Sequence, residues 1–364
     1  MPETPRVSVV MPVHNGGAYL ESAVDSILGQ TFTAFEFVII DDGSADSTAE
    51  LLRRRQAADP RVRVLSQARA GLVASLNRGC REARAPYIAR MDADDIAFPE
   101  RLARQVEFLD RHPGVAVVGS AVVRIDASGR RLKRNVCPTS HVEIVEALRE
   151  YVCFTHPSVM LRAAALAAVG GYRPAYGPAE DYDLWLRLSE RYELANLPDP
   201  LLYYRVYPGQ LSVRQLDQQI LSVVGARAAA RQRALTGRDR SPAHELITPG
   251  LLREWGVADT TLADAMGAGY RYAAYAMQQA GRQDEAIELL RTGRRLSGGR
   301  GGLGPLLAGA CAKQARIAFR GGHLLAGLSL AVEACRTQPS LPLQLLRARP
   351  GRPRAGARDA GAMP

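Results

Sequence analysis

The strongest constraint in this sequence is the alternation of short apolar runs and helix-patterned segments over residues 7–91. The apolar runs are Val7–Val13, Phe35–Ile40, Val62–Leu65 and Tyr87–Met91. Runs with so little polar alternation are typical of parallel strands that are covered on both faces. Strands separated by helices at this spacing predict βαβ units. We therefore expect an α/β fold, in which a mostly parallel sheet flanked by helices is followed by a smaller all-α C-terminal region.

Polar side chains gather where three of these strands end. They are His14 and Asn15 after the first run, Asp41 and Asp42 after the second, and Asp92, Asp94 and Asp95 after the fourth. Open α/β sheets bind ligands at the carboxyl ends of their strands. A carboxylate after the second strand would bond a base or a ribose, and those after the fourth would hold a metal ion beneath a diphosphate.

The loop after the fourth strand is the candidate metal site. Its three carboxylates repel one another unless water or a cation compensates their charge. Hard oxygen atoms suit Mg²⁺ or Mn²⁺, which commonly bridge protein carboxylates and the phosphates of a substrate. The alternative is structural, because Asp92 or Asp94 would also cap the helix-patterned run that begins at Pro99. The loop alone leaves both interpretations open.

Several classes of protein are disfavoured by what the sequence lacks. No G-x-G-x-x-G follows the first apolar run and no G-x-x-x-x-G-K-[ST] occurs, which argues against a dehydrogenase or a P-loop enzyme. The five cysteines show no C-x-x-C spacing, so we expect no disulfide framework or zinc site and a reducing, cytoplasmic location. The sequence contains no apolar run long enough for a membrane-spanning helix and no signal-peptide core at its start.

A second acidic pair, Glu180 and Asp181, begins a predicted helix whose apolar stripe is Leu184, Trp185 and Leu188. Carboxylates in a first turn complement the helix dipole, which stabilises a helix by a few tenths of a kcal/mol up to about 1 kcal/mol. Alternatively, one of the two is a general base, because a carboxylate flanked by carboxylates has a raised pKa. The spacing favours neither interpretation.

Five motifs, in this order along the chain, resemble those of family 2 glycosyltransferases, which are inverting enzymes with the GT-A fold. The likeness covers about residues 6–210. The motifs are Val9–Asn15, Ile40–Ser44, Met91–Asp95, His156-Pro157 with Gly170-Gly171-Tyr172, and Glu180–Trp185.

The resemblance implies roles for residues on the donor side. Pro12, Val13 and Asn15 would line the nucleoside site. Asp41 and Asp42 would form the nucleotide-binding turn, with Asp42 facing the base. His14 stands where the family more often has an aromatic residue.

Around the diphosphate, the resemblance makes Asp94 the direct ligand of the divalent ion and Asp92 a ligand of the ribose or the metal. Arg90 would face the diphosphate, unless it is simply solvated. Arg205 would reach the leaving group from a closing loop over residues 204–212. That loop has Tyr207 where the family usually has His, which weakens the case for a metal ligand there.

The implied mechanism is a single displacement. Asp181 would act as the base on an acceptor hydroxyl, with Glu180 beside it, while the nucleoside diphosphate leaves with its charge held by the metal. We therefore expect a metal-dependent, inverting hexosyltransferase that moves a sugar from a nucleotide-sugar, a UDP-sugar in the first instance, to a glycan or lipid-linked acceptor in polysaccharide or surface-glycan synthesis. The alternatives are a nucleotidyltransferase and a non-catalytic sugar-nucleotide-binding scaffold with a helical interaction domain.

The boundaries that we predict are a catalytic domain over residues 1–212, a helical extension and linker over 213–250, a helical region resembling tetratricopeptide hairpins over 251–346, and a disordered basic tail over 347–364. Residues 291–364 carry 13 Lys and Arg against 2 Asp and Glu. Within them, Lys313, Arg316 and Arg320 mark one face of a helical pattern. Such a helix either lies on an anionic membrane surface or is a core helix with a solvated face. Without interleaved aromatic residues, the basic end does not predict nucleic-acid binding.

Overall fold

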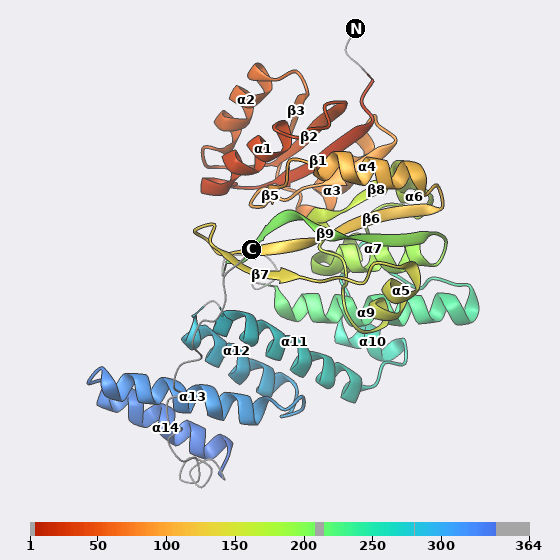
Figure 1. Ribbon diagram of the computed structural model, residues 1–364. Coiled ribbons are helices and arrows are strands. Elements are labelled where there is room, and N and C mark those ends of the chain that lie inside the picture. The colour runs from red at the N-terminus through yellow and green to blue at the C-terminus, as the bar shows by residue number, and fades with distance from the viewer. Residues whose placement is uncertain (1–3, 208–214, 280, 340–364) are drawn as a thin grey trace, which may run out of the picture. The chain divides into compact units, whose positions relative to one another are not determined.

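The computed structural model describes residues 4–207, 215–279 and 281–339. Over these residues the N-terminal part is built on a nine-stranded sheet with the order β3-β2-β1-β4-β8-β6-β9-β5, and β7 pairs with β6 (Figure 1). The strands are β1 (Val7–Val13), β2 (Phe35–Asp42), β3 (Val62–Gln67), β4 (Tyr87–Arg90), β5 (Ile96–Ala97), β6 (Val115–Ile125), β7 (Arg131–Asn135), β8 (Met160–Arg162) and β9 (Glu193–Arg205).

Helices flank this sheet, and their order along the chain confirms the α/β class predicted from the sequence. They are α1 (Leu20–Leu28), α2 (Thr48–Ala58), α3 (Leu72–Glu82), α4 (Arg101–Arg111), α5 (His141–Glu150), α6 (Ala163–Ala168), α7 (Glu180–Ser189), α9 (Leu216–Thr236) and α10 (Pro249–Glu254), with short 3-10 turns η1 (Gly17–Tyr19), η2 (His156–Ser158) and η3 (Pro174–Ala179).

The first four strands are parallel, as the apolar runs predict, and β1 lies between β2 and β4. The rest of the sheet is mixed, because β8 pairs antiparallel with both β4 and β6 while β9 runs parallel to β6. Parallel pairing of β2, β1 and β4 brings the ends of these three strands to one edge of the sheet. The predicted clustering of the strand-end polar residues therefore follows from the topology.

Two segments differ from what their residues predict. The apolar runs 115–120 and 121–125 predict two strands, but they form one continuous strand, β6. The stretch from Thr155 to Met160 also predicts a strand, but it begins with the 3-10 turn η2, and only Met160 to Arg162 joins the sheet. Pro157 explains the turn, since proline has a fixed φ and no N–H to offer to a strand ladder.

The core of this part is made by the strands that periodicity identified. Every residue of β1 and β2 is buried. Helix α3 packs closely on them at Gly79, where an added Cβ would come within 2.4 Å of Val10 Cγ1. The small residue thus permits the close helix–strand approach that brings the start of α3 to the strand ends.

By its internal contacts the chain divides into two compact units, residues 1–262 and 263–364. The predicted extension over 213–250 includes α9, which packs on α7 and η3 within the first unit. One anchor is Arg227, whose Nε donates to Tyr182 Oη at 2.7 Å. Helix α9 is therefore an integral part of the unit that carries the candidate site.

The second unit is helical, as expected. It comprises most of α11 (Asp259–Gln279) with α12 (Gln283–Leu296), α13 (Leu303–Arg320) and α14 (Leu324–Thr337). Helix α13 packs on both α12 and α14, and left-handed glycines such as Gly281 and Gly322 make the turns between helices. Across the described residues, none of the helices combines the length and apolar character needed to span a bilayer. The likeness to tetratricopeptide hairpins stays a prediction, and the tail over 347–364 lies outside the described residues.

Candidate active site

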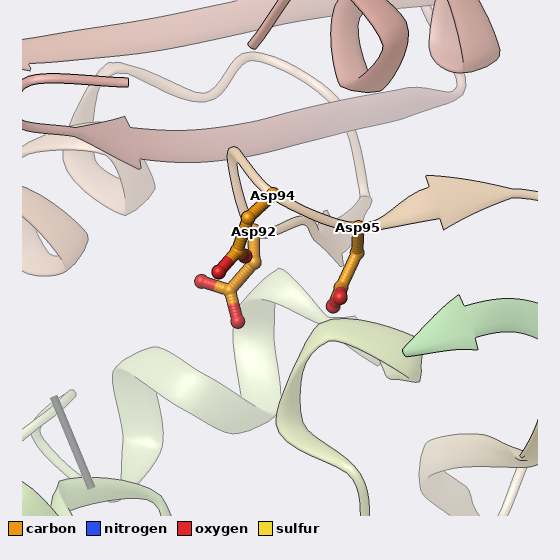
Figure 2. A group of neighbouring side chains, drawn as sticks. All are labelled: Asp92, Asp94 and Asp95. Atoms are coloured by element: carbon orange, nitrogen blue, oxygen red, sulfur yellow. The ribbon is translucent and has the colours of Figure 1, made fainter. Parts of the chain in front are cut away.

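The loop that follows β4 gathers three carboxylates. One oxygen from each of Asp92, Asp94 and Asp95 lies within 4.8 Å of the others (Figure 2). Burial, with the negative charge of Asp92 added to it, raises the pKa of Asp94 to about 6 and that of Asp95 well above its usual value. Asp95 is buried, and its Oδ2 has no hydrogen-bond partner among the described residues. The loop thus concentrates negative charge that the protein itself only partly compensates.

Arg205, at the end of β9, holds this loop in place. Its backbone N–H donates to Asp95 Oδ1 at 2.8 Å, and its Nε donates to the carbonyl oxygen of Asp94 at 2.8 Å. The guanidinium also lies over the Tyr19 ring, 4.2 Å from its centroid. These contacts make Arg205 a positioning residue for the acidic loop, and the predicted contact with a leaving group stays a proposal.

Tyr207 joins the first and fourth strand ends. Its hydroxyl hydrogen-bonds to Asp94, and its ring centroid lies 5.5 Å from that of Tyr19, in the turn after β1. Burial and the charge of Asp94 raise the pKa of Tyr207. The position where the family usually has a histidine is therefore taken by the neutral phenol of Tyr207, which hydrogen-bonds to Asp94. Residues 208–212 of the predicted closing loop lie outside the described residues.

Arg90, the last residue of β4, is not solvated. It is only 4% exposed and forms an ion pair with Asp92. Burial alone would lower the pKa of this arginine, but the negative charges of Asp92 and Glu180 outweigh it and raise the pKa. Arg90 therefore lies within electrostatic reach of the two acidic motifs that the sequence singled out, which are 88 residues apart from Asp92 to Glu180.

The second acidic pair opens α7. Burial, together with the charge of Asp181, raises the pKa of Glu180 to about 8, whereas burial raises that of Asp181 to about 6. The Nδ1 of buried His156 lies 3.7 Å from Glu180 Oε1, and burial holds the pKa of this histidine far below its usual value. Of the two carboxyls, Glu180 therefore holds its proton more tightly, and Asp181, whose side chain is partly exposed, ionises more readily. His156 beside them is kept neutral by burial.

Helix α7 is seated by a buried ion pair one turn further on. Arg187 Nη2 lies 2.8 Å from Asp183 Oδ2 and also donates to the carbonyl oxygen of Gly171. The neighbouring Tyr172 is held by Asn77 of α3, which donates to its carbonyl and accepts from its N–H. The Gly-Gly-Tyr turn is thereby fixed between α3 and α7, which sets the position of the carboxyl pair.

The two turns on the donor side are locked together. Asn15, with a left-handed φ of 51°, accepts from the N–H of Ala45 at 2.8 Å through its Oδ1, and its own N–H donates to Ser44 Oγ at 2.9 Å. Pro12 and Val13 are buried in β1. Asn15 thus couples the turn after β1 to the turn after β2, and the predicted contacts of these three residues with a nucleoside stay a proposal.

The carboxylate of Asp42 is held by three short hydrogen bonds. Its carboxylate accepts from Gln67 Nε2 and from the N–H groups of Ala70 and Gly71, at 2.7 to 2.8 Å. Burial opposes ionisation, but these hydrogen bonds outweigh it and lower the pKa of Asp42. Asp42 therefore braces β2 against the turn before α3, while Asp41 accepts one bond, from the N–H of Ser44 at 3.1 Å.

Comparison with known proteins decides the family. Residues 8–167 match the model of glycosyl transferase family 2. Amylovoran biosynthesis glycosyltransferase AmsE of Erwinia amylovora is 35% identical over 199 residues, which are 54% of this chain and 74% of that protein. O-antigen biosynthesis glycosyltransferase WbnJ of Escherichia coli is 32% identical over 205 residues, or 55% of this chain and 80% of that protein. This chain belongs to glycosyl transferase family 2.

The fold of this glycosyltransferase agrees with that assignment. TarS 1-349 of S. aureus, crystallised in complex with UDP-GlcNAc, superimposes with a TM-score of 0.54 at 16% identity, covering 93% of this chain and 92% of that one. At this identity the likeness concerns the fold alone, and it confirms the expected GT-A arrangement of the catalytic unit.

Two buried residues of this glycosyltransferase that hold the backbone just before the acidic loop were not predicted from the sequence. Arg101 of α4 is fully buried and donates to the carbonyl oxygens of Arg90 and Val159. One turn later, Gln105 donates to the carbonyl oxygen of Ser158 at 2.7 Å. The signal was present, because Arg101 and Gln105 interrupt the buried stripe of an otherwise amphipathic helix.

Proposed function

We propose that this glycosyltransferase is metal-dependent and inverting, and that it moves a sugar from a nucleotide-sugar to an acceptor hydroxyl. The observation that carries the proposal is the position of Arg90, paired with Asp92 and within the electrostatic influence of Glu180. It supports a single reaction centre in which the acidic loop handles the leaving diphosphate and α7 supplies the base.

The acidic loop fits a divalent cation. Three carboxylates with oxygen atoms within 4.8 Å are the donor set that Mg²⁺ or Mn²⁺ prefers, and no hydrogen-bond partner for buried Asp95 Oδ2 is found in the described part of the chain. We propose Asp94 as the direct ligand, with Asp92 beside it. A bound ion would neutralise charge that develops on the departing diphosphate.

The remaining chemistry belongs to the side chains around Arg90. Asp181, ionised and partly exposed at neutral pH, is the group able to accept the proton of the acceptor hydroxyl as that oxygen attacks the anomeric carbon. Glu180 stays protonated beside it, so its carboxyl adds no second negative charge. In this proposal Asp181 is the one ionised carboxylate of the pair that faces the acceptor. It is positioned by helix α7, which the ion pair between Asp183 and Arg187 holds in place.

The donor class and the biological product are proposed from relatives. The names of AmsE and WbnJ refer to amylovoran and O-antigen biosynthesis, so we propose a glycan or lipid-linked acceptor in surface-polysaccharide assembly. TarS was crystallised with UDP-GlcNAc, and we place UDP-sugars first among the donors to be tested. We propose that Pro12, Val13 and Asn15 line the nucleoside site and that Asp41 and Asp42 form the nucleotide-binding turn beside it. Asp42, which also braces that turn, is the residue proposed to face the base.

The test is release of nucleoside diphosphate from a panel of UDP-, GDP- and dTDP-sugars, with Mg²⁺, Mn²⁺ or a chelator present. We expect turnover with at least one donor, loss with the chelator and loss in Asp94→Ala. Asp110→Asn is the control, because Asp110 pairs with Arg6 outside the site. Turnover that survives both the chelator and Asp94→Ala would remove the metal from the proposal, whereas release of pyrophosphate would favour a nucleotidyltransferase.

A further inference from the structure

Helix α14 exposes an apolar stripe. Leu324, Leu325, Leu328 and Val332 are 67%, 86%, 56% and 42% exposed, and their spacing places them on one side of the helix. The opposite side packs within the unit, where an added Cβ on Gly327 would come within 2.6 Å of the Phe319 ring. Soluble monomers rarely expose large contiguous apolar surfaces without a binding role. We call these four residues the α14 stripe.

The stripe ends at a surface hollow with a cation on its rim. This hollow, of about 380 Å³, is lined by Ala331, Val332, Cys335 and Arg336. Val332 belongs both to the stripe and to the hollow, so the two features are continuous. An apolar surface that continues into a hollow beside a guanidinium suits a hydrocarbon chain with a negatively charged group at its end.

Basic residues outnumber acidic residues on the two helices that form this surface. Helices α13 and α14 carry Lys313, Arg316, Arg320 and Arg336, and their one acidic residue, Glu333, is already held by Arg291 Nε at 2.8 Å. The two helices therefore carry a net positive charge, which is complementary to an anionic partner.

We propose that the α14 stripe docks this enzyme on an anionic lipid bilayer. An exposed apolar helix face flanked by arginines is the pattern of a helix that lies in a membrane interface. A second copy of the chain is a poorer occupant, because α13 and α14 carry four basic residues against one acidic residue, and a contact between two copies would bring two surfaces of like net charge together. The proposal concerns the helical unit and does not depend on the identity of the donor sugar.

The experiment is co-sedimentation of the full-length protein with phosphatidylcholine vesicles, with and without one quarter phosphatidylglycerol. We expect binding to the anionic vesicles that falls as salt is added, and a loss of at least about tenfold in the double variant Leu325→Glu/Leu328→Glu. The double variant Arg320→Glu/Arg336→Glu should weaken binding and flatten its salt dependence. Leu235→Glu is the matched control, because Leu235 is 74% exposed on α9, in the other unit, and should bind like the wild type. Equal unfolding temperatures would show that all variants are folded.

Three results would overturn the proposal. The first is no sedimentation with anionic vesicles, or equal sedimentation of the wild type and Leu325→Glu/Leu328→Glu. The second is a wild-type dimer in lipid-free ultracentrifugation that the same double variant converts to monomer, which would assign the stripe to a second copy. The third is vesicle binding that appears only after truncation at residue 339, which would mean that the chain's own C-terminal segment covers the stripe.

Discussion

The two carboxyl groups at the start of α7 can be told apart by a pair of isosteric substitutions. Asp181→Asn removes the group that is ionised at neutral pH, whereas Glu180→Gln replaces a carboxyl that is already neutral there. A general base typically contributes about 10²- to 10⁴-fold to rate, so we expect Asp181→Asn to lose that much kcat. Glu180→Gln should lose less than about tenfold, because the amide keeps the shape and the neutral charge of the protonated acid.

The fall of kcat/KM at low pH gives a quantitative test of Asp181 as the general base. With a pKa of about 6, Asp181 is ionised in roughly one enzyme molecule in ten at pH 5, so kcat/KM should fall about tenfold from its plateau. An aspartate at the ordinary value of 3.8 would still be more than about 90% ionised at that pH. The groups that face the pair are His156 and Arg90, of which His156 is held neutral by burial and Arg90 stays charged. Asp94 also has a pKa of about 6, so the profile is measured at saturating Mn²⁺, which would keep Asp94 ionised and leave the acid limb to Asp181.

The assay is nucleoside diphosphate release between pH 4.5 and 8.5, with the donor kept well below its KM so that the rate reports kcat/KM. We expect Glu180→Gln to keep the acid limb near pH 6 and Asp181→Asn to abolish it. The assignment is refuted if Glu180→Gln is the inactive variant, or if wild-type kcat/KM is flat down to pH 5. Thermal unfolding of each variant, measured alongside, separates loss of the base from loss of the fold.

Three further experiments test other parts of the site. Asp94→Ala should abolish the rise in unfolding temperature that Mn²⁺ gives with a bound nucleoside diphosphate, which differential scanning fluorimetry will show; an unchanged rise would place the ion elsewhere. Arg101→Met should cost about 1–3 kcal/mol for each main-chain carbonyl that loses its buried donor, measured by urea unfolding, and an unchanged midpoint would contradict the support role. Gly171→Ala should destabilise more than Gly170→Ala, because both have positive φ but only at Gly171 would the Cβ meet Asn77, 2.8 Å from its Oδ1.

The part of the fold that sequence reasoning predicted well is the part where periodicity reports burial directly. The strands β1, β2 and β4 are short, apolar and covered on both faces. This pattern predicts both that these residues form strands and that the strands pair in parallel. The mixed half of the sheet was harder, because β8 has three residues and its pairing with β4 and β6 is set by contacts distant in sequence.

The candidate site was also predicted only in part from the sequence. Acidic motifs predict which residues carry charge, and in the structure Asp92, Asp94 and Asp181 lie within electrostatic range of Arg90. The sequence did not predict which hydrogen-bond partners each polar side chain has. The hydrogen bonds of Asp42 to Ala70 and Gly71, and those of Arg205 to the acidic loop, depend on backbone atoms that only the folded chain places nearby.

The balance of charge around Arg90 gives the physical reason to expect a cation. Asp92, Asp94, Asp95, Glu180 and Asp181 lie within reach of one buried guanidinium, and the chain reduces their repulsion by keeping Glu180 neutral and by holding Asp95 with Arg205 and Arg101. These devices leave the acidic loop with more negative charge than its ion pair with Arg90 neutralises. A divalent ion there, together with the diphosphate that it accompanies, would balance the loop and leave Asp181 as the one uncompensated carboxylate, which is the condition that a general base on the acceptor side requires.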